Sequence, residues 1–148
     1  MLHLEDLSPG QRFQSRSIAV SADDIKAFAH QYDPQPFHLD EAEAAGAFFG
    51  ALVASGWQTA AVTMRLVVES FPLAGGVIGA GGELTWPAPV RPGDQLSVET
   101  EVLEVKPSRS NPDRGSAMVR ITTRTQTGQP VQIATMRVLL VRRQAAGA

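Results

Sequence analysis

Apolar residues early in the chain recur at helical spacing and predict an amphipathic helix. Those at positions i, i+3, i+4 and i+7 are Ile25, Phe28, Ala29 and Tyr32. Ser21 can cap the start of this helix, and acidic residues follow it in the first turn. Pro34 predicts the end of the helix near Asp33, because proline disfavours helical geometry in the residue before it. A strand is expected earlier, near residues 12–20.

The next segment, 33–38 (DPQPFH), contains two prolines and is expected to form a loop. A short helix is expected to begin at Asp40, which can cap it with Glu43 three residues on. Gly46 and Gly50 then interrupt the pattern.

The strongest helical pattern covers residues 57–71. Its apolar positions at helical spacing are Trp57, Ala60, Ala61, Met64, Val68 and Phe71. Leu66 and Val67 widen the apolar stripe, so this helix is expected to be buried on most sides. Ser55 can cap it, and Gln58 at the third helical position would complete a capping box. Pro72 ends the helix.

Beyond Pro72 the pattern becomes that of β-strands, which are expected at 77–86, 95–105, 117–125 and 131–141. Residues 91–94 have turn composition, residues 126–129 join two strands as a hairpin, and residues 107–116 form a polar loop. The order of elements predicts a single α+β domain over residues 1–148. In it, an antiparallel sheet curls around one long helix.

Composition narrows the function classes. The chain has 148 residues, of which 43% are hydrophobic, and a net charge of −2, which argues against a nucleic-acid binder. It has no cysteine, so disulfides and thiolate chemistry are excluded. There is no signal-peptide pattern and no apolar run long enough to span a membrane, so a cytoplasmic location is expected. The three histidines lack metal-ligand spacing and no glycine-rich nucleotide loop is present, so neither a metal nor a bound cofactor is expected.

Asp33 and His38 are candidates for acid–base chemistry. The two prolines between them restrict the loop, so a carboxylate and an imidazole could converge on one water molecule and polarise it. The alternative is that Asp33 caps a turn and His38 satisfies a backbone group. The spacing alone leaves both interpretations open.

Two further features could contact a ligand. The start of the 57–71 helix leaves backbone N–H groups free, and Gly56 has no side chain to shield its own, so a carbonyl oxygen could bind there. Alternatively, Gly56 only permits close packing. Lys106, Arg109 and Arg114, around the polar loop, suit a phosphate group. Alternatively, they belong to an ordinary solvated loop.

Taken together, these segments resemble the MaoC-like acyl dehydratase family, which includes the (R)-specific enoyl-CoA hydratases. The resemblance covers residues 10–142. The matching motifs, in order, are 33–40 (DPQPFHLD), 54–57 (ASGW), 86–94 (WPAPVRPGD) and 108–115 (SRSNPDRG).

The resemblance implies a hot-dog fold, in which a long helix is wrapped by an antiparallel sheet, and a homodimer. It implies hydration of a trans-2-enoyl thioester, or the reverse, with coenzyme A as part of the substrate. Asp33 and His38 would hold the water and Gly56 would bind the thioester oxygen. The expected substrate-binding residues are Gln35, Ser55, Trp57, Lys106, Arg109 and Arg114.

The sequence also departs from the family pattern. Gln35 and Ser55 stand where hydratases often have asparagine and histidine. Met64 stands about where they carry a serine on the central helix, which leaves the support of Asp33 open. Two other functions remain: a hot-dog thioesterase, for which Glu69 is the only acid on the central helix, and a non-catalytic acyl-CoA-binding subunit.

Overall fold

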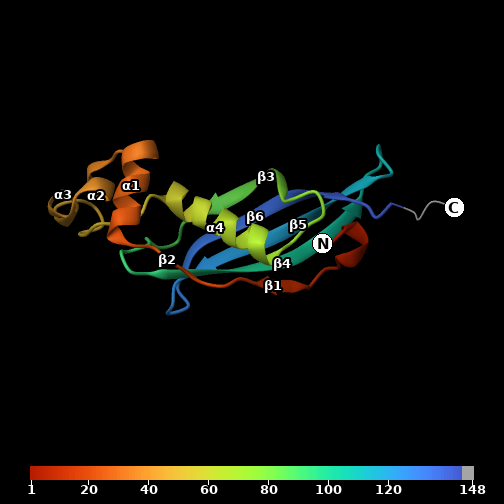
Figure 1. Cartoon of the computed structure of the whole chain (residues 1–148), viewed down its shortest axis with the longest axis horizontal. Helices are drawn as coiled ribbons and strands as arrows, with labels where there is room; N and C mark the ends of the chain where they lie inside the picture. The colour runs from red at the N-terminus through yellow and green to blue at the C-terminus, as the bar shows by residue number, and fades with distance from the viewer. Residues whose placement is uncertain (145–148) are drawn as a thin grey trace.

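The computed structural model describes residues 1–144. One antiparallel sheet, in the order β1-β4-β5-β6-β3, carries a long helix on one face, and the sheet is not closed (Figure 1). The sheet elements are β1 (Arg12–Gln14), β2 (Ile18–Ala19), β3 (Ile78–Thr85), β4 (Gln95–Pro107), β5 (Arg114–Arg124) and β6 (Pro130–Val141). The helices are η1 (Leu4–Asp6), α1 (Ala22–Tyr32), α2 (Pro36–Leu39), α3 (Glu41–Ala45) and α4 (Gly56–Ser70). The predicted α+β arrangement is confirmed.

The long helix α4 packs on the sheet because both present apolar rows to each other. Along β4, alternate residues point inward and are buried, from Leu96 to Val102. From α4, Leu66 and Val67 meet this face, and Phe71 closes the end of the helix. Burying such side chains contributes about 1.5–3 kcal/mol each, so this contact holds α4 against the sheet.

A lobe of three helices, α1 to α3, projects beyond the sheet at the N-terminal end of α4 (Figure 1). Ser21 and Asp24 form the capping box of α1, each side chain bonding the other residue's backbone N–H at 3.0 Å. Asp40 caps α3 as predicted, by accepting hydrogen bonds from the N–H groups of Ala42 and Glu43. A second apolar cluster, which includes Ile25 and Val90, attaches the lobe to the sheet.

Four local predictions need correction. The segment 33–38 is not a continuous loop, because α2 begins at Pro36, whose fixed φ suits the first turn of a helix. The strand expected at 12–20 is two short strands. The predicted capping box at Ser55 does not form, because the Gln58 side chain is buried and its Oε1 has no hydrogen-bond partner within residues 1–144. The polar loop is shorter than 107–116, because the β4–β5 ladder continues to Pro107 and Gly115.

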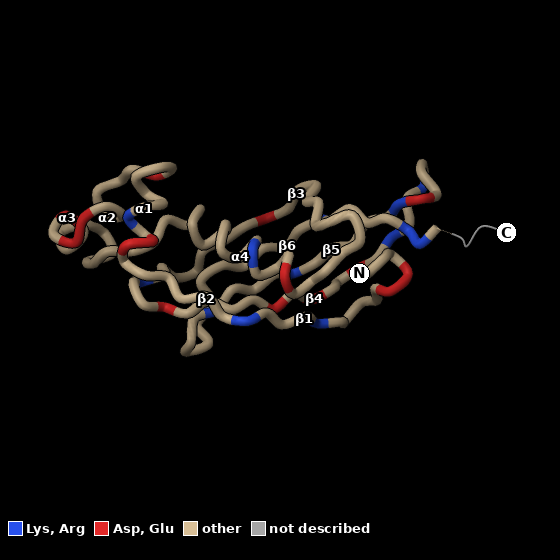
Figure 2. Tube along the Cα trace, in the orientation of Figure 1, with Lys and Arg blue, Asp and Glu red and all other residues tan. Residues whose placement is uncertain are grey.

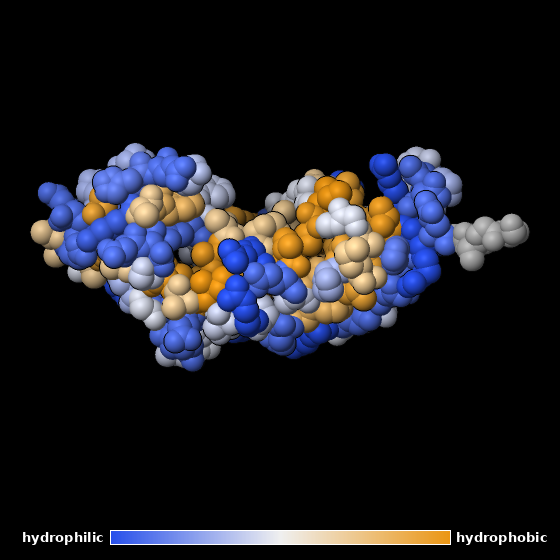
Figure 3. Space-filling model, in the orientation of Figure 1, coloured by the Kyte–Doolittle hydropathy of each residue, from blue (hydrophilic) through white to orange (hydrophobic). Residues whose placement is uncertain are grey.

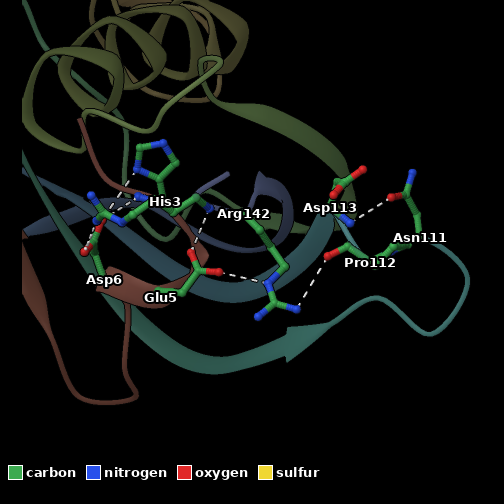
Figure 4. Close-up of polar contacts among 8 residues, drawn as sticks. His3, Glu5, Asp6, Asn111, Pro112, Asp113 and Arg142 are labelled. Carbon is green, nitrogen blue, oxygen red and sulfur yellow. Dashed lines mark hydrogen bonds and ion pairs between the residues drawn. The ribbon is translucent and has the colours of Figure 1, made fainter. Parts of the chain in front are cut away.

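At the opposite end of the sheet, the N-terminal segment is tied to the end of β6 (Figure 4). The Arg142 side chain donates to Glu5 at 2.8 Å, and Asp6 pairs with Arg143 at 2.7 Å. Arg142 also donates to the carbonyl oxygen of Pro112, at the tip of the β4–β5 hairpin. The hydrogen bond from Arg142 lowers the pKa of Glu5 to about 2. These contacts hold the hairpin tip at the end of the molecule away from the helical lobe.

Candidate active site

A cavity of about 790 Å³ lies between the helical lobe, the start of α4 and the segment 86–91. Figure 3 shows the hollow between the lobe and the body of the molecule. Aromatic rings form much of its wall: Phe37, Phe48, Phe49, Trp57 and Trp86. Trp57 and Trp86 meet edge to face, with ring centroids 5.1 Å apart. The cavity is therefore an apolar vestibule in which a few polar groups are concentrated.

Asp33 and His38 converge in this cavity. Asp33 ends α1 and His38 lies on α2, and the tight turn between them places Asp33 Oδ2 3.4 Å from His38 Nε2. The geometric part of the prediction, that the two side chains meet beside the start of α4, is confirmed. The carboxylate is held on both sides, since Ser55 Oγ donates to Oδ2 at 2.7 Å and Gln35 Nε2 donates to Oδ1 at 2.6 Å.

The imidazole of His38 is held in a defined tautomer. The side chain is buried, and its Nδ1 lies 2.6 Å from the carbonyl oxygen of Val53. A carbonyl oxygen only accepts hydrogen bonds, so Nδ1 carries the proton. The other ring nitrogen, Nε2, then faces Asp33. His38 therefore satisfies a backbone group, as one interpretation held, and its Nε2 is left to interact with Asp33 and the cavity.

The carboxyl group of Asp33 is stabilised in its charged form. Burial by itself raises the pKa, but hydrogen bonds from Ser55 and Gln35, together with the charge of His38, outweigh it and lower the pKa below its ordinary value. A carboxyl group with a lowered pKa stabilises the fold above its unfolded-state pKa. That stabilisation is lost as the pH falls through the folded-state value. Asp33 is thus an anion at neutral pH.

Replacing Gln35 by Leu is expected to raise the pKa of Asp33, because the carboxylate loses a hydrogen-bond donor. A ¹³C NMR titration of the Asp33 carboxyl carbon in both proteins measures the change. Ser55→Ala is expected to raise the pKa too and, since Ser55 also caps α4, to cost about 1 kcal/mol of stability. If neither substitution moves the titration midpoint of Asp33, the hydrogen bonds from Gln35 and Ser55 do not control the pKa of its carboxyl group.

Gly56 is the first residue of α4 and faces the same cavity. Its N–H has no hydrogen-bond partner among residues 1–144, since the Ser55 hydroxyl accepts from Trp57 and the Ser55 carbonyl accepts from the next turn. A Cβ at this position would lie 2.7 Å from the indole ring of Trp86. The position therefore requires close packing, as one interpretation held, and the binding of a carbonyl oxygen by the Gly56 N–H stays a prediction.

The hydroxyl group that supports Asp33 comes from Ser55 and not from position 64. Met64 lies on the exposed side of α4, with 43% of its surface accessible. Ser55 reaches Asp33 because the end of α1 meets the start of α4. The sequence left open how Asp33 is supported when Met64 stands in place of a serine. Asp33 has two hydrogen-bond partners, Ser55 and Gln35, without it.

The predicted phosphate-binding residues are not brought to this cavity. Lys106 lies near the end of β4, where it pairs with Glu104 at 3.1 Å, and Arg114 begins β5. Arg109 lies in the hairpin between the two strands, and this hairpin, where Figure 2 shows basic residues, is at the end of the molecule opposite the helical lobe. Within one chain, only Gln35 and Trp57 of the remaining predicted substrate-binding residues line the cavity, while Ser55 lies behind Asp33.

Residues 1–144 contain no group of three or more His, Asp or Glu side chains placed to hold a metal ion. None of the helices in this range is long and apolar enough to cross a membrane.

The antiparallel sheet packed around one long helix places the chain among the hot-dog-fold proteins. The chain belongs to the MaoC-like domain family, whose model matches residues 6–125. A MaoC-like dehydratase from Rhodospirillum rubrum is 55% identical with a TM-score of 0.95, over 98% of this chain and 100% of that one.

Two further relatives carry more specific names. The 3-hydroxybutyryl-CoA dehydratase of Methylorubrum extorquens is 34% identical over 110 residues, which are 74% of this chain and 69% of the relative. The unliganded (R)-hydratase PhaJ1 of Pseudomonas aeruginosa is 27% identical with a TM-score of 0.75, over 99% of this chain and 92% of that one. The predicted hot-dog fold is confirmed by these structures.

Proposed function

We propose that the chain is a hydro-lyase of the enoyl-CoA hydratase or 3-hydroxyacyl-CoA dehydratase type. It adds water to, or removes water from, the 2,3 double bond of an acyl thioester. One observation carries the proposal: Asp33 Oδ2 and His38 Nε2 face each other across 3.4 Å at the base of a cavity. The names of the dehydratase and hydratase relatives support it.

The facing atoms explain how water is held. Asp33 is anionic, and when His38 carries its single proton on Nδ1, its Nε2 has a lone pair, so the two facing atoms are both acceptors. A water molecule bound between them would donate one hydrogen to each and turn its oxygen lone pair toward the cavity. Asp33 and His38 are thereby suited to hold and polarise the attacking water.

In the hydration direction, the water oxygen bonds to the β-carbon and the π electrons move toward the thioester carbonyl. One member of the pair accepts a proton from the water as its oxygen attacks, and the pair returns a proton to the α-carbon, so both residues end in the protonation state in which they began. Negative charge develops on the thioester oxygen, which the free N–H of Gly56 and the N-terminal dipole of α4 would stabilise. Dehydration follows the same steps in reverse, with coenzyme A as part of the substrate.

A thioesterase mechanism is less well supported by the same geometry. Glu69, the only acid on α4, lies near the end of that helix and is paired with Arg16 at 2.7 Å and Arg65 at 3.1 Å. It does not line the cavity that holds Asp33 and His38. The central helix thus offers no carboxylate to activate water against the thioester carbon.

The proposal is tested by incubating the protein with short and medium 2-enoyl-CoAs. Loss of the conjugated thioester absorbance, with a 3-hydroxyacyl-CoA product and no free thiol, is expected. Thiol release without hydrated product would assign the protein to the thioesterase class. Tight binding of acyl-CoA without any reaction would favour the non-catalytic subunit.

We also propose a homodimer. The outer edge of β3 is unpaired and almost all of its residues are exposed, an arrangement that proteins usually cover. Beside it, α4 exposes an apolar stripe in which Trp57 is 61%, Met64 43% and Val68 51% accessible. Figure 3 shows apolar surface gathered along this part of the molecule. A second copy, pairing β3 with β3 in antiparallel fashion, would cover both features.

Met64→Lys is expected to weaken this dimer, because the charge would be buried between the two copies of α4. Light scattering at micromolar concentration measures the mass, with the wild type at twice 15.8 kDa and the variant shifted toward the single chain. Gln129→Lys, on the exposed β5–β6 hairpin, adds the same charge and should leave the dimer intact. A wild-type protein found only as the single chain would contradict the proposal.

Such a dimer would bring the predicted phosphate-binding residues of one copy near the cavity of the other. Antiparallel pairing of β3 turns the partner so that its β4–β5 hairpin lies at the same end as this chain's cavity. Lys106, Arg109 and Arg114 of one copy could then bind the diphosphate of a coenzyme A thioester held in the other. Their role remains a proposal that depends on the dimer.

A further inference from the structure

Polar side chains interrupt the packing between α4 and the sheet beneath the first two turns of the helix. We refer to these residues as the polar seam; its members are Thr59, Thr63, Thr123 and Gln132, all less than 5% exposed. Thr123 and Gln132 are paired across neighbouring strands β5 and β6. The seam separates the two apolar clusters of the molecule, since aliphatic packing resumes at Leu66.

Three members of the seam already have partners. The hydroxyl groups of Thr63 and Thr123 lie 2.6 Å apart, and the side-chain oxygen of Gln132 accepts from Trp86 Nε1 at 2.9 Å. Thr59 differs from them. It is 3% exposed and lines the cavity, and its hydroxyl is in none of the side-chain hydrogen bonds formed among residues 1–144. The hydroxyl is therefore available to a group that occupies the cavity.

Thr59 lies where the acyl chain of a bound substrate would be expected to reach. Thr59 lies one helical turn beyond Gly56, on the side of α4 that faces the sheet, and no residue further along α4 lines the cavity. An acyl thioester whose carbonyl oxygen binds at Gly56 would extend its acyl group toward Thr59. Because Thr59 is the last residue of α4 that lines the cavity, a short acyl chain that follows the helix would end beside it.

We infer that Thr59 is a specificity-determining residue that selects a short acyl thioester bearing a neutral hydrogen-bonding group, such as a hydroxyl or a carbonyl, near the end of its chain. The inference rests on the proposed function. The seam contains no charged side chain, so a charged substituent would lack a counter-ion there. An alkyl chain would leave the Thr59 hydroxyl buried without a partner, and buried polar groups left unpaired discriminate strongly against such analogues.

Equilibrium binding tests the inference independently of turnover. Calorimetric titration of the full chain with butanoyl-CoA and 4-hydroxybutanoyl-CoA, both saturated and unreactive toward hydration, gives a ratio of dissociation constants. The wild type is expected to bind the hydroxylated thioester about tenfold more tightly. Thr59→Val, which keeps the shape of the side chain, should remove this preference, and Thr59→Ser should retain it.

A matched control comes from the seam itself. The paired substitution Thr63→Val with Thr123→Val replaces both partners of one buried hydrogen bond, which proteins tolerate well, and should leave the ratio unchanged. Equal affinity of the wild type for the two thioesters, or a preference that Thr59→Val does not alter, overturns the inference alone. Failure of both thioesters to bind overturns the inference together with the acyl-thioester function.

Discussion

Asp33→Asn is expected to lower the rate of enoyl thioester hydration by about 10²–10⁴-fold, the usual contribution of a general acid–base group. The amide cannot accept a proton, and it no longer carries the charge that orients water toward the substrate. The side chain keeps its size at the junction of α1 and α4, so the fold should persist. Continuous measurement of enoyl-CoA absorbance gives the rate, and circular dichroism checks the fold.

Asparagine is a better substitution than alanine for testing His38. His38 is buried and bonds the carbonyl of Val53, so truncation to alanine would leave that carbonyl unpaired at a cost of about 1–3 kcal/mol. His38→Asn can keep a donor near Nδ1 while removing Nε2. We expect a similar loss of rate with little loss of stability.

The double variant, Asp33→Asn with His38→Asn, tests more sharply whether the two residues act in the same step. If Asp33 and His38 act as a unit on one water molecule, the double variant should lose far less than the product of the two single losses. Independent, multiplicative losses would mean that the two residues do not share a step. Activity that survives removal of both side chains would end their assignment as the acid–base pair.

The elements that sequence reasoning predicted well are those set by local rules. The capping box of Ser21 and Asp24 needs only neighbouring residues, and the apolar stripe of α4 repeats within a single helix. The meeting of Asp33 and His38 was also predictable, because only a tight, proline-containing turn separates them. What spacing could not reveal was that both residues also have a structural partner.

Contacts between distant segments were missed for a physical reason. The bond from Ser55 to Asp33 joins residues 22 positions apart and depends on how the α1 lobe sits against α4. The packing of Trp86 on Gly56 likewise depends on where β3 ends. No local pattern encodes either contact, although a glycine at a helix start indicated that something approaches closely there.

The misplaced phosphate-binding residues could have been located from topology. Successive strands of an antiparallel sheet reverse direction, so the segments after β3 and after β4 must lie at opposite ends of the sheet. The cavity uses the segment 86–91 after β3, whereas Lys106 lies near the end of β4 and Arg109 follows that strand. The residue types alone suggested phosphate binding. The direction of the strands, however, decides at which end of the sheet those residues lie.

Removing the N–H of Gly56 is expected to lower the hydration rate by about 10²–10³-fold, the loss seen when one donor to a developing oxyanion is deleted. Gly56→Pro achieves this at the backbone. Proline is favoured at the first position of a helix, and Ser55 before it already has an extended backbone with ψ of 138°, which suits a residue preceding proline. The helix should therefore still form.

The matched control is Gly56→Ala, because alanine keeps the N–H but introduces the same Cβ that would lie 2.7 Å from Trp86. Both variants must displace the indole ring, whose Nε1 is held by Gln132 at 2.9 Å, so both should lose some stability and some substrate affinity. The difference in kcat/KM between them isolates the N–H group. A proline variant as active as the alanine variant would show that Gly56 serves only to admit Trp86, and that the thioester oxygen is stabilised elsewhere.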